Sequence, residues 1–256
     1  MLTEPLIQQL HTLRLKGMAT ALERQIATPN LAERSFEDRL ALLIQNEVTE
    51  RATFRLAQRL RWARLPMPAC LEDLDTRAPR GLDTAQFAQL TDLHWIREHL
   101  NVLVTGPTGV GKSYLAAALA HSACRADFSV RCFRIPRLVE ELARYSALHK
   151  RSLLFRQLAR ADLLVLDDFG LAPLADETVR DLLEILDDRY DRRSTLITSQ
   201  LPVDQWHAYL GDRTVADAIL DRLVHNSYRI VLKGESMRRH KGVTARDAPP
   251  AKPKNH

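Results

Sequence analysis

Long apolar runs and an N-terminal export signal are both missing from this 256-residue sequence. Its apolar runs are short, such as residues 163–166, and none approaches the roughly 20 residues that span a bilayer. The first residues, Met1 to Leu6, hold an acid and a proline where a signal peptide would carry basic and then apolar residues. We therefore expect neither a membrane-spanning nor an exported protein.

Cysteine is also scarce, and its spacing matches no metal-binding or disulfide pattern. The three residues, Cys70, Cys124 and Cys132, are odd in number and include no CxxC pair. This spacing argues against a disulfide framework or structural zinc, and it fits the reducing cytoplasm. His94 and His99 lie close together, but no cluster of cysteines or carboxylates completes a metal site around them.

What is present is the composition of a globular protein. Hydrophobic residues make up 45% and charged residues 27% of the chain, which supplies a core for one or two domains. The formal net charge of +5 is unevenly placed: residues 1–70 carry +3, residues 71–228 carry −4 and residues 229–256 carry +6. This balance permits a polyanionic partner.

Residues 1–68 are predicted to form a small all-α domain. Apolar residues recur at helical spacing over the first 22 residues, and Pro29 marks a break. Ser35 and Asp38 resemble a capping box that starts a long helix over 36–64, and the prolines that follow end it. This domain is expected to bind DNA or a partner protein.

Residues 69–245 are predicted to form an α/β domain, followed by a basic, disordered tail over 246–256. Short apolar segments alternate with helical ones from residue 101 onward. Strands are expected over 101–105, 130–133, 163–166, 195–198 and 228–232, and helices over 114–123, 136–145, 178–190 and 216–225. Buried strands separated by helices predict a parallel sheet covered on both faces, an αβα sandwich.

A phosphate-binding loop is predicted over residues 106–113, whose sequence GPTGVGKS matches GxxxxGK[ST] between a strand and a helix. Its glycines let backbone amides face phosphate oxygens, and the helix N-terminus adds its positive end. We expect Lys112 to reach the β- and γ-phosphates and Ser113 to ligate Mg²⁺. The predicted nucleotide-binding residues are Gly106, Pro107, Thr108, Gly109, Val110, Gly111, Lys112, Ser113 and Tyr114.

A second element of the phosphate site is the apolar segment that ends in Asp167 and Asp168. In P-loop proteins, Mg²⁺ is held at the carboxyl end of a buried strand beside the phosphate loop. We expect Asp167 to hold Mg²⁺ through water and Asp168 to orient or deprotonate the attacking water. The polar residues Thr198, Ser199 and Gln200, at the end of the next predicted strand, are candidates to face the γ-phosphate and the water. Of these, Ser199 joins Lys112 and Asp168 in the predicted catalytic set.

The base is predicted to be adenine, because the sequence contains no Asn-Lys-x-Asp element of the kind that guanine-specific P-loop proteins usually carry. His94, Trp95 and Ile96 lie just before the first predicted strand and could line an adenine pocket. For Trp95, a place in the hydrophobic core is the favoured interpretation.

Five segments resemble the IstB-like ATPases, the transposition helper proteins of insertion sequences, which are relatives of the DnaC-type helicase loaders. These segments are residues 106–113, 163–170, 197–202, 218–226 and 233–238. The resemblance covers nearly the whole chain. It implies an AAA+ fold with a helical N-terminal domain, ATP and Mg²⁺ as cofactors, ATP-dependent oligomerisation on double-stranded DNA, and a transposase as partner.

The resemblance also implies roles for arginines. Arg222 corresponds to the finger that reaches the γ-phosphate held by the next protomer, where a fixed cation offsets charge on the transferring group; Arg213 is a competitor for this role. Arg238 corresponds to a sensor-2 arginine that acts on the nucleotide of its own chain. Many AAA+ proteins carry glutamate where this chain has Asp168, so the shorter side chain must reach its water differently.

Residues 51–64 contain five arginines and no acid. Arg51, Arg55 and Arg59 are spaced by four and form one row on a helix, a pattern that suits DNA phosphates without reading the base sequence. Because solvated helix faces usually interleave acids, we expect this row to contact DNA or a protein partner.

The leading interpretation is an ATP-dependent, DNA-binding assembly factor that helps a transposase capture target DNA, with ATP hydrolysis driving disassembly. The alternative is a replicative helicase loader, which shares the ATPase core and differs in the partner that its N-terminal domain grips. A small-molecule kinase would need a lid and a substrate pocket, and the sequence shows neither clearly.

Overall fold

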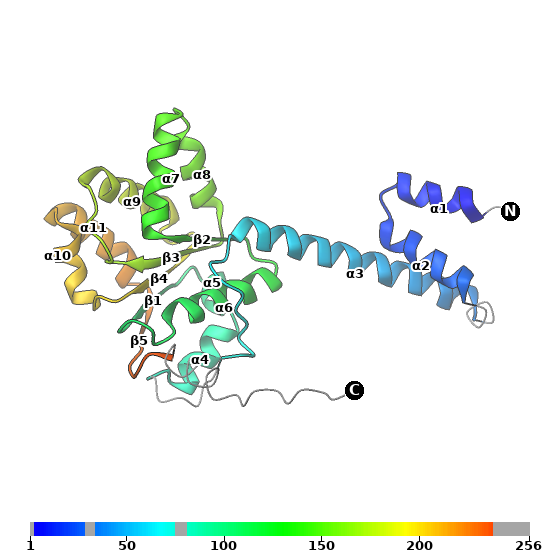
Figure 1. Cartoon of the computed structure of the whole chain (residues 1–256), viewed down its shortest axis with the longest axis horizontal. Coiled ribbons are helices and arrows are strands. Elements are labelled where there is room, and N and C mark those ends of the chain that lie inside the picture. Colours follow the sequence, from blue (N-terminus) through cyan, green and yellow to red (C-terminus); the bar gives the residue numbers. More distant parts are fainter. Residues whose placement is uncertain (1–2, 29–33, 75–80, 238–256) are drawn as a thin grey trace, which may run out of the picture. The chain divides into compact units, whose positions relative to one another are not determined.

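The computed structural model of the chain describes residues 3–28, 34–74 and 81–237 (Figure 1). The chain divides into two compact units, residues 1–59 and 60–256, and the division falls within the long helix α3 (Phe36–Ala63). The break predicted at Pro29 and the tail predicted over 246–256 lie outside the described residues. The domain boundary after residue 68 stays a prediction.

The N-terminal unit is helical. Helices α1 (Thr3–Thr12) and α2 (Lys16–Ala27) precede α3, and the chain turns between them through Arg14, whose φ is 60°. The Oγ of Ser35 accepts a hydrogen bond of 3.1 Å from the N–H of Asp38. This bond satisfies a backbone donor at the start of α3, and it confirms the predicted cap.

One face of α3 exposes apolar side chains in the N-terminal unit. Leu40, Ile44 and Val48 follow each other at a spacing of four, and 37%, 50% and 53% of their surfaces are exposed. Helix α2 contacts α3 elsewhere, where the N–H of Met18 donates to Glu47 Oε2 at 3.1 Å. This apolar row therefore lies outside the core of the unit, on a face that a partner could cover.

Five parallel strands form the sheet of the larger unit, in the order β2-β3-β4-β1-β5. They are β1 (Asn101–Thr105), β2 (Val130–Arg134), β3 (Leu163–Phe169), β4 (Ser194–Ser199) and β5 (Ser227–Val231). The predicted parallel sheet is thereby confirmed. Because β1 lies between β4 and β5, the loop that leaves β1 emerges beside the carboxyl ends of both neighbours.

Helices cover both faces of the sheet (Figure 1). They are α4 (Thr84–Thr91), α5 (His94–Arg97), α6 (Lys112–Arg125), α7 (Ile135–Ala147), α8 (Arg151–Arg160), α9 (Asp176–Arg189), the 3₁₀ turn η2 (Val203–Gln205), α10 (Trp206–Leu210) and α11 (Arg213–Val224). One apolar core is formed by the helices α7, α8, α9, α10 and α11 and one face of the sheet. Helix α6 packs on the other face. Within the described ranges, no helix combines the length and apolar character needed to cross a bilayer.

Helix α8 was not predicted from the sequence. In α8, Leu154, Phe155 and Leu158 are buried and lie on one face. Arginines occupy much of the other face, so an amphipathic pattern is present over ten residues. No proline or glycine marks either end of α8, which is why its bounds are hard to see in the sequence.

A buried arginine joins several elements of the larger unit. Arg189 at the end of α9 is 1% exposed, and its guanidinium donates to the carbonyls of Leu158, Ala161 and Ser194 and to Thr195 Oγ1. Burial lowers the pKa of Arg189 to about 9. The four acceptors offset the cost of desolvating this cation, and they fix α8 and the start of β4 against α9.

Trp95 belongs to the core, as favoured from the sequence. Its side chain is 1% exposed, and its indole N–H donates to the carbonyl of Leu90 at 3.0 Å. The backbone carbonyl of Trp95 also accepts a bond from Ser194 Oγ at 3.2 Å. The buried ring has no surface left for an adenine base.

Candidate nucleotide-binding site

The predicted phosphate loop lies between β1 and α6. Strand β1 ends at Thr105, and α6 begins at Lys112 with Gly111 as its N-cap. The fourteen-residue helix directs the positive end of its dipole, and its unpaired backbone N–H groups, at the loop. Sequence and geometry agree here on a site for the phosphates of a nucleotide.

The side chain of Lys112 lies against the backbone of the phosphate loop. Its Nζ donates to the carbonyls of Gly106 at 2.7 Å and Pro107 at 2.8 Å, and the residue is 6% exposed. Burial lowers the pKa of Lys112, and the nearby carboxylates of Asp168 and Asp167 oppose that shift. A nucleotide phosphate could replace the two carbonyls as the partner of this cation and would relieve its desolvation cost.

Ser113 and Asp167 form the candidate magnesium site. The Oγ of Ser113 donates to Asp167 Oδ1 at 2.8 Å, so both oxygens lie within reach of one cation. The same Asp167 oxygen accepts a hydrogen bond from Thr198 Oγ1, and Asp167 is 5% exposed. A hydroxyl and a carboxylate are the hard oxygen ligands that Mg²⁺ prefers beside phosphates, so the residues fit this ion.

The carboxylate of Asp168 is held by an arginine that was not predicted from the sequence. Arg134 at the end of β2 donates to Asp168 Oδ2 from Nε at 2.8 Å and from Nη2 at 2.6 Å. Its side chain is 56% exposed, whereas that of Asp168 is 16% exposed. The sequence signal for it is weak: Arg134 directly follows the strand predicted over 130–133, and only the pairing of β2 with β3 brings it to Asp168.

Ser199 does not take the position predicted for it. Its hydroxyl is buried, donates to the carbonyl of Phe169 at 2.6 Å and accepts the N–H of Leu201 at 3.0 Å. The next residue, Gln200, contacts the phosphate loop instead, because Thr108 Oγ1 donates to Gln200 Oε1 at 2.8 Å. Side chains alternate along a strand, so a shift of one residue exchanges the inward and outward positions.

Arg222 lies away from the phosphate loop of its own chain. Arg222, near the end of α11, bonds to Asp187 and to the carbonyl of Ala218, and its backbone carbonyl accepts a bond from the Asn101 side chain. Asn101 begins β1, so Arg222 is at the opposite edge of the sheet. Arg213 begins α11 and is exposed. Arg238 lies outside the described residues.

The row of arginines on α3 belongs to the N-terminal unit. Arg51 is 56% exposed and its Nε donates to Glu47 Oε1 at 2.7 Å, one helical turn earlier. Arg55 is exposed, and Arg59 is partly covered. Arg51 and Arg55 therefore present cations to solvent, although the charge of Arg51 is partly neutralised within the helix.

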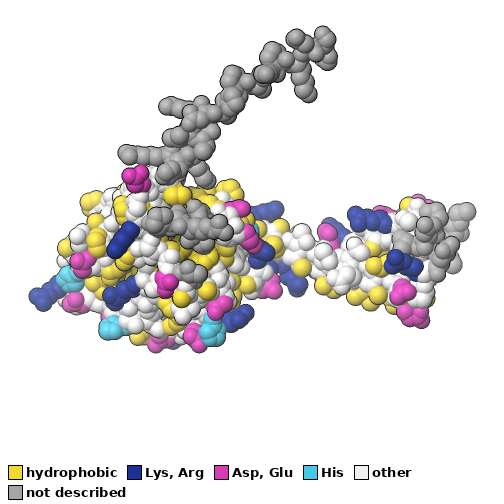
Figure 2. Space-filling view, turned by 90° about the horizontal axis from the view of Figure 1, so that it is seen from below, with side chains coloured by type: hydrophobic (Ala, Val, Ile, Leu, Met, Phe, Trp, Pro, Cys, Tyr) yellow, Lys and Arg dark blue, Asp and Glu magenta, His cyan; other side chains and the backbone are white. Residues whose placement is uncertain are grey.

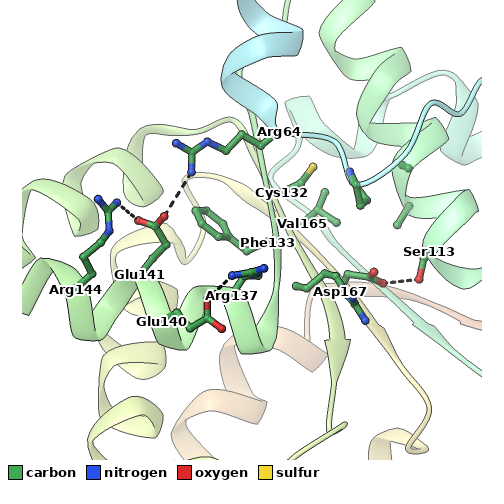
Figure 3. A pocket seen from close by; sticks show the side chains of 14 residues that line it. Arg64, Ser113, Cys132, Phe133, Arg137, Glu140, Glu141, Arg144, Val165 and Asp167 are labelled. Carbon is green, nitrogen blue, oxygen red and sulfur yellow. Dashed lines mark hydrogen bonds and ion pairs between the residues drawn. The ribbon is translucent and has the colours of Figure 1, made fainter.

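A cavity of about 340 Å³ adjoins the candidate magnesium site (Figure 3). It opens between α6, β2, β3, α7 and the segment that follows α3. Ala116, Cys132 and Val165 give it an apolar floor, and Ser113 and Asp167 lie at one end. At the other end, Glu141 pairs with Arg64, from the segment that follows α3, and with Arg144 on its own helix.

Tyr114 packs against the segment that follows α3. Its ring lies against a small cluster formed by Ala69, Ala117 and Ala118, beside Met67. The cluster attaches the segment that follows α3 to the outer side of α6. Tyr114 therefore supports the helix that carries the phosphate site.

The fold and the site define a P-loop nucleotide-binding protein of the AAA+ class. The five-stranded parallel order, the loop between β1 and α6 and the acids at the end of β3 are its defining features. The crystal structure of DnaI has a TM-score of 0.56 to this chain at 22% identity, covering 66% of this chain and 95% of DnaI. The DnaC helicase loader has a TM-score of 0.51 at 22% identity, covering 64% and 97%.

The chain belongs to the family described as IstB-like ATP binding protein, whose model matches residues 8–245. It is 50% identical to an insertion sequence ATP-binding protein of Sinorhizobium fredii over 94% of this chain and 98% of that relative. It is 32% identical to the ATP-binding protein of insertion sequence IS21 from Pseudomonas aeruginosa, over 96% and 94%. The chain is thus an ATP-binding protein of the insertion-sequence type.

Proposed function

We propose that this protein is an ATPase that assembles on double-stranded DNA when it binds ATP, and that the assembly recruits or activates a transposase. Hydrolysis of ATP then drives disassembly. The observation that carries the proposal is the joined phosphate loop and acidic strand end, with Ser113 Oγ 2.8 Å from Asp167 Oδ1, in a chain of the insertion-sequence family. The names of its relatives support the link to transposition.

Each residue of the site has a separate role in the proposed hydrolysis of ATP. Lys112 exchanges its two loop carbonyls for the β- and γ-phosphates of ATP, and loop amides bind the same oxygens. Ser113 and Asp167 would hold Mg²⁺, which neutralises charge on the phosphates when it is bound. Asp168 orients the attacking water once Arg134 releases its carboxylate. Gln200, and not Ser199, is the polar residue that follows β4 and contacts the phosphate loop.

Assembly is expected to complete the site. Arg222 lies at the sheet edge opposite its own phosphate loop, so it can only serve a nucleotide held by a neighbouring protomer. Its bond to Asp187 would open when the neighbour's γ-phosphate offers a stronger anion. ATP, but not ADP, would thereby favour the closed interface between protomers.

The N-terminal unit is the proposed contact for DNA. On the face of the larger unit seen in Figure 2, acidic and basic side chains are interspersed and form no continuous basic patch. Arg51, Arg55 and Arg59 instead form a row without intervening acids on α3. A row of cations at one-turn spacing suits a run of backbone phosphates.

The test is electron microscopy of the protein with duplex DNA in ATP and in ADP. Ordered assemblies are expected in ATP and dispersed protein in ADP. Lys112→Ala should abolish ATP-dependent assembly, because it removes the cation that holds the β- and γ-phosphates. Lys150→Ala is the control, since Lys150 is an exposed residue between α7 and α8 that does not touch the loop. Assembly of the Lys112 variant at wild-type ATP concentrations would contradict the proposal.

A replicative helicase loader stays the alternative function, because the fold of DnaI and DnaC covers about two thirds of this chain. The two functions differ in the partner protein. Capture of purified transposase by the ATP-bound protein, without capture of a replicative helicase, would separate them.

A further inference from the structure

The segment that follows β5, residues 232–237, lies against the phosphate loop, and we call it the strap. The N–H of Leu232 donates to the carbonyl of Thr105 at 2.8 Å, which continues the pairing of β5 with β1 up to the start of the loop. At the other end of the strap, the N–H of Met237 donates to the carbonyl of Gly109 at 3.0 Å. Two backbone hydrogen bonds thus fasten the strap to the loop and its base.

Two glycines of the loop leave room for the strap. Gly106 has a φ of 147°, and a Cβ there would be 2.2 Å from the carbonyl oxygen of Leu232. Gly109 has a φ of 86°, and a Cβ there would be 2.2 Å from Ser236 Oγ and 2.7 Å from Ser236 Cβ. Any side chain at either position would push the strap away, so the loop and the strap fit together.

The bond from Met237 fixes one peptide plane of the loop. In a trans peptide, the carbonyl of one residue and the N–H of the next point in opposite directions. Because the Gly109 carbonyl is held toward the strap, the N–H of Val110 faces away from it. Amides of this loop that face inward are the groups that bind phosphate oxygens.

We propose that the strap is a positioning element of the nucleotide site. Ser236 and the Met237 amide hold the peptide between Gly109 and Val110 in the orientation that binds the phosphate chain, before the nucleotide arrives. Such preorganisation lowers the cost of binding. It applies to nucleoside di- and triphosphates and not to monophosphates, which lack the β-phosphate that the loop encloses. The proposal rests on the nucleotide site of the proposed function, and it requires neither DNA nor a transposase.

The first test compares Met237→Pro, which removes the N–H, with Met237→Ala, which keeps it. We expect the Kd for ADP to rise about tenfold in the proline variant and to change less than about twofold in the alanine variant, as for one hydrogen bond to a polarised acceptor. The Kd for AMP should be equal in both variants. Fluorescence titration with each nucleotide measures these values, and nucleotide-free melting temperatures show whether both variants fold.

A second test uses side-chain substitutions at the contact between Gly109 and Ser236. Gly109→Ala should weaken ADP binding, and adding Ser236→Gly should restore part of the affinity, because the clash at Ser236 is removed. Gly106→Ala is the matched control: Ser236→Gly should not rescue it, since its clash is with the Leu232 backbone.

Equal ADP affinity in Met237→Pro and Met237→Ala would overturn the proposal. So would an equal loss of AMP affinity, which would indicate general damage to the fold. If the proline variant does not fold, the absence of rescue by Ser236→Gly overturns it. Failure of the wild-type protein to bind ADP at all would instead overturn the nucleotide site and, with it, the proposed function.

Discussion

At the scale of single residues, Asp168 depends on its neighbours for the geometry of its carboxylate. Its φ of 61° is uncommon for a residue with a side chain, and its N–H is held by Thr198 Oγ1 at 3.2 Å. Arg134 holds the carboxylate at one oxygen, and this hydrogen bond raises the pKa of Arg134. The guanidinium therefore stays charged, and it competes with water for Asp168.

Removal of the arginine should release the carboxylate. We expect Arg134→Ala to raise ATP turnover in the absence of DNA, because Asp168 then meets the attacking water without first breaking an ion pair. The gain should not exceed about fivefold, since an exposed ion pair is worth up to about 1 kcal/mol. A phosphate-release assay at saturating ATP measures it.

Arg137→Ala provides the control for this prediction. Arg137 is 75% exposed, lies in the first turn of α7 and pairs with Glu140, not with Asp168. Its removal should leave turnover unchanged. A fall in turnover in the Arg134 variant would show that the arginine supports catalysis and does not restrain it.

At the scale of secondary-structure elements, the last turn of α3 belongs to the larger unit and is bound to the sheet of that unit. The carbonyl of Trp62, in that turn, accepts a bond of 2.7 Å from Arg131 Nη1. The Arg131 guanidinium lies 5.0 Å from the ring centroids of both Trp62 and Phe133. Since Arg131 and Arg134 are both in β2, one short strand contacts the end of α3 and the proposed catalytic carboxylate, Asp168.

Neutralising the arginine row, Arg51, Arg55 and Arg59, should weaken DNA binding uniformly across sequences. We expect replacement of all three by alanine to make the slope of log affinity against log salt shallower, by roughly 0.9 for each phosphate that the variant no longer neutralises. Fluorescence anisotropy with two unrelated duplexes over a range of salt concentrations measures the slope.

Arg160→Ala is the matched control, because Arg160 is an exposed arginine at the end of α8, outside the row. Its slope should equal that of the wild type. An unchanged slope in the triple variant would place the DNA contact elsewhere, and the exposed apolar row of α3 would then favour a protein partner for this helix.

At the scale of the whole molecule, the two halves of the proposed hydrolytic site lie at opposite edges of one sheet. Lys112 and Asp167 are at the carboxyl ends of β1 and β3, whereas Arg222 is beside the start of β1. A parallel sheet cannot bring these edges together within one chain. Joining them requires contact between protomers.

Mixing two inactive variants tests this arrangement. Lys112→Ala and Arg222→Ala should each lose most ATP turnover, and an equal mixture should recover part of it. Recovery is expected because the Lys112 variant supplies its intact Arg222 to the intact loop of the other variant. Turnover measured as a function of mixing ratio gives the size of the effect.

Asp187→Ala serves as the control in this experiment, because it removes the partner that holds Arg222 within its own chain but keeps the arginine. It should retain turnover alone. Mixtures that recover with Arg213→Ala but not with Arg222→Ala would assign the finger to Arg213 instead.

The phosphate site shows which features could be predicted from local sequence and which could not. The loop, Lys112 and the paired acids were predicted because a fixed spacing between a strand and a helix sets their geometry. Ser199 was placed one residue from the position that contacts the loop, because only the register of β4 decides which side chains face the site. Arg134 was missed because its partner is 34 residues away, in a neighbouring strand.

The sequence by itself determined the class of the protein. Strand and helix periodicity, the phosphate-loop spacing and the family motifs are local patterns, and together they were sufficient to indicate a parallel α/β nucleotide-binding fold of the IstB-like family. Only the tertiary structure decided which residues meet at the site, such as the strap on Gly109 and Arg134 on Asp168, and that Arg222 lies at the far edge of the sheet. These contacts join segments distant in the chain, and their geometry follows from strand order and packing, which no local spacing encodes.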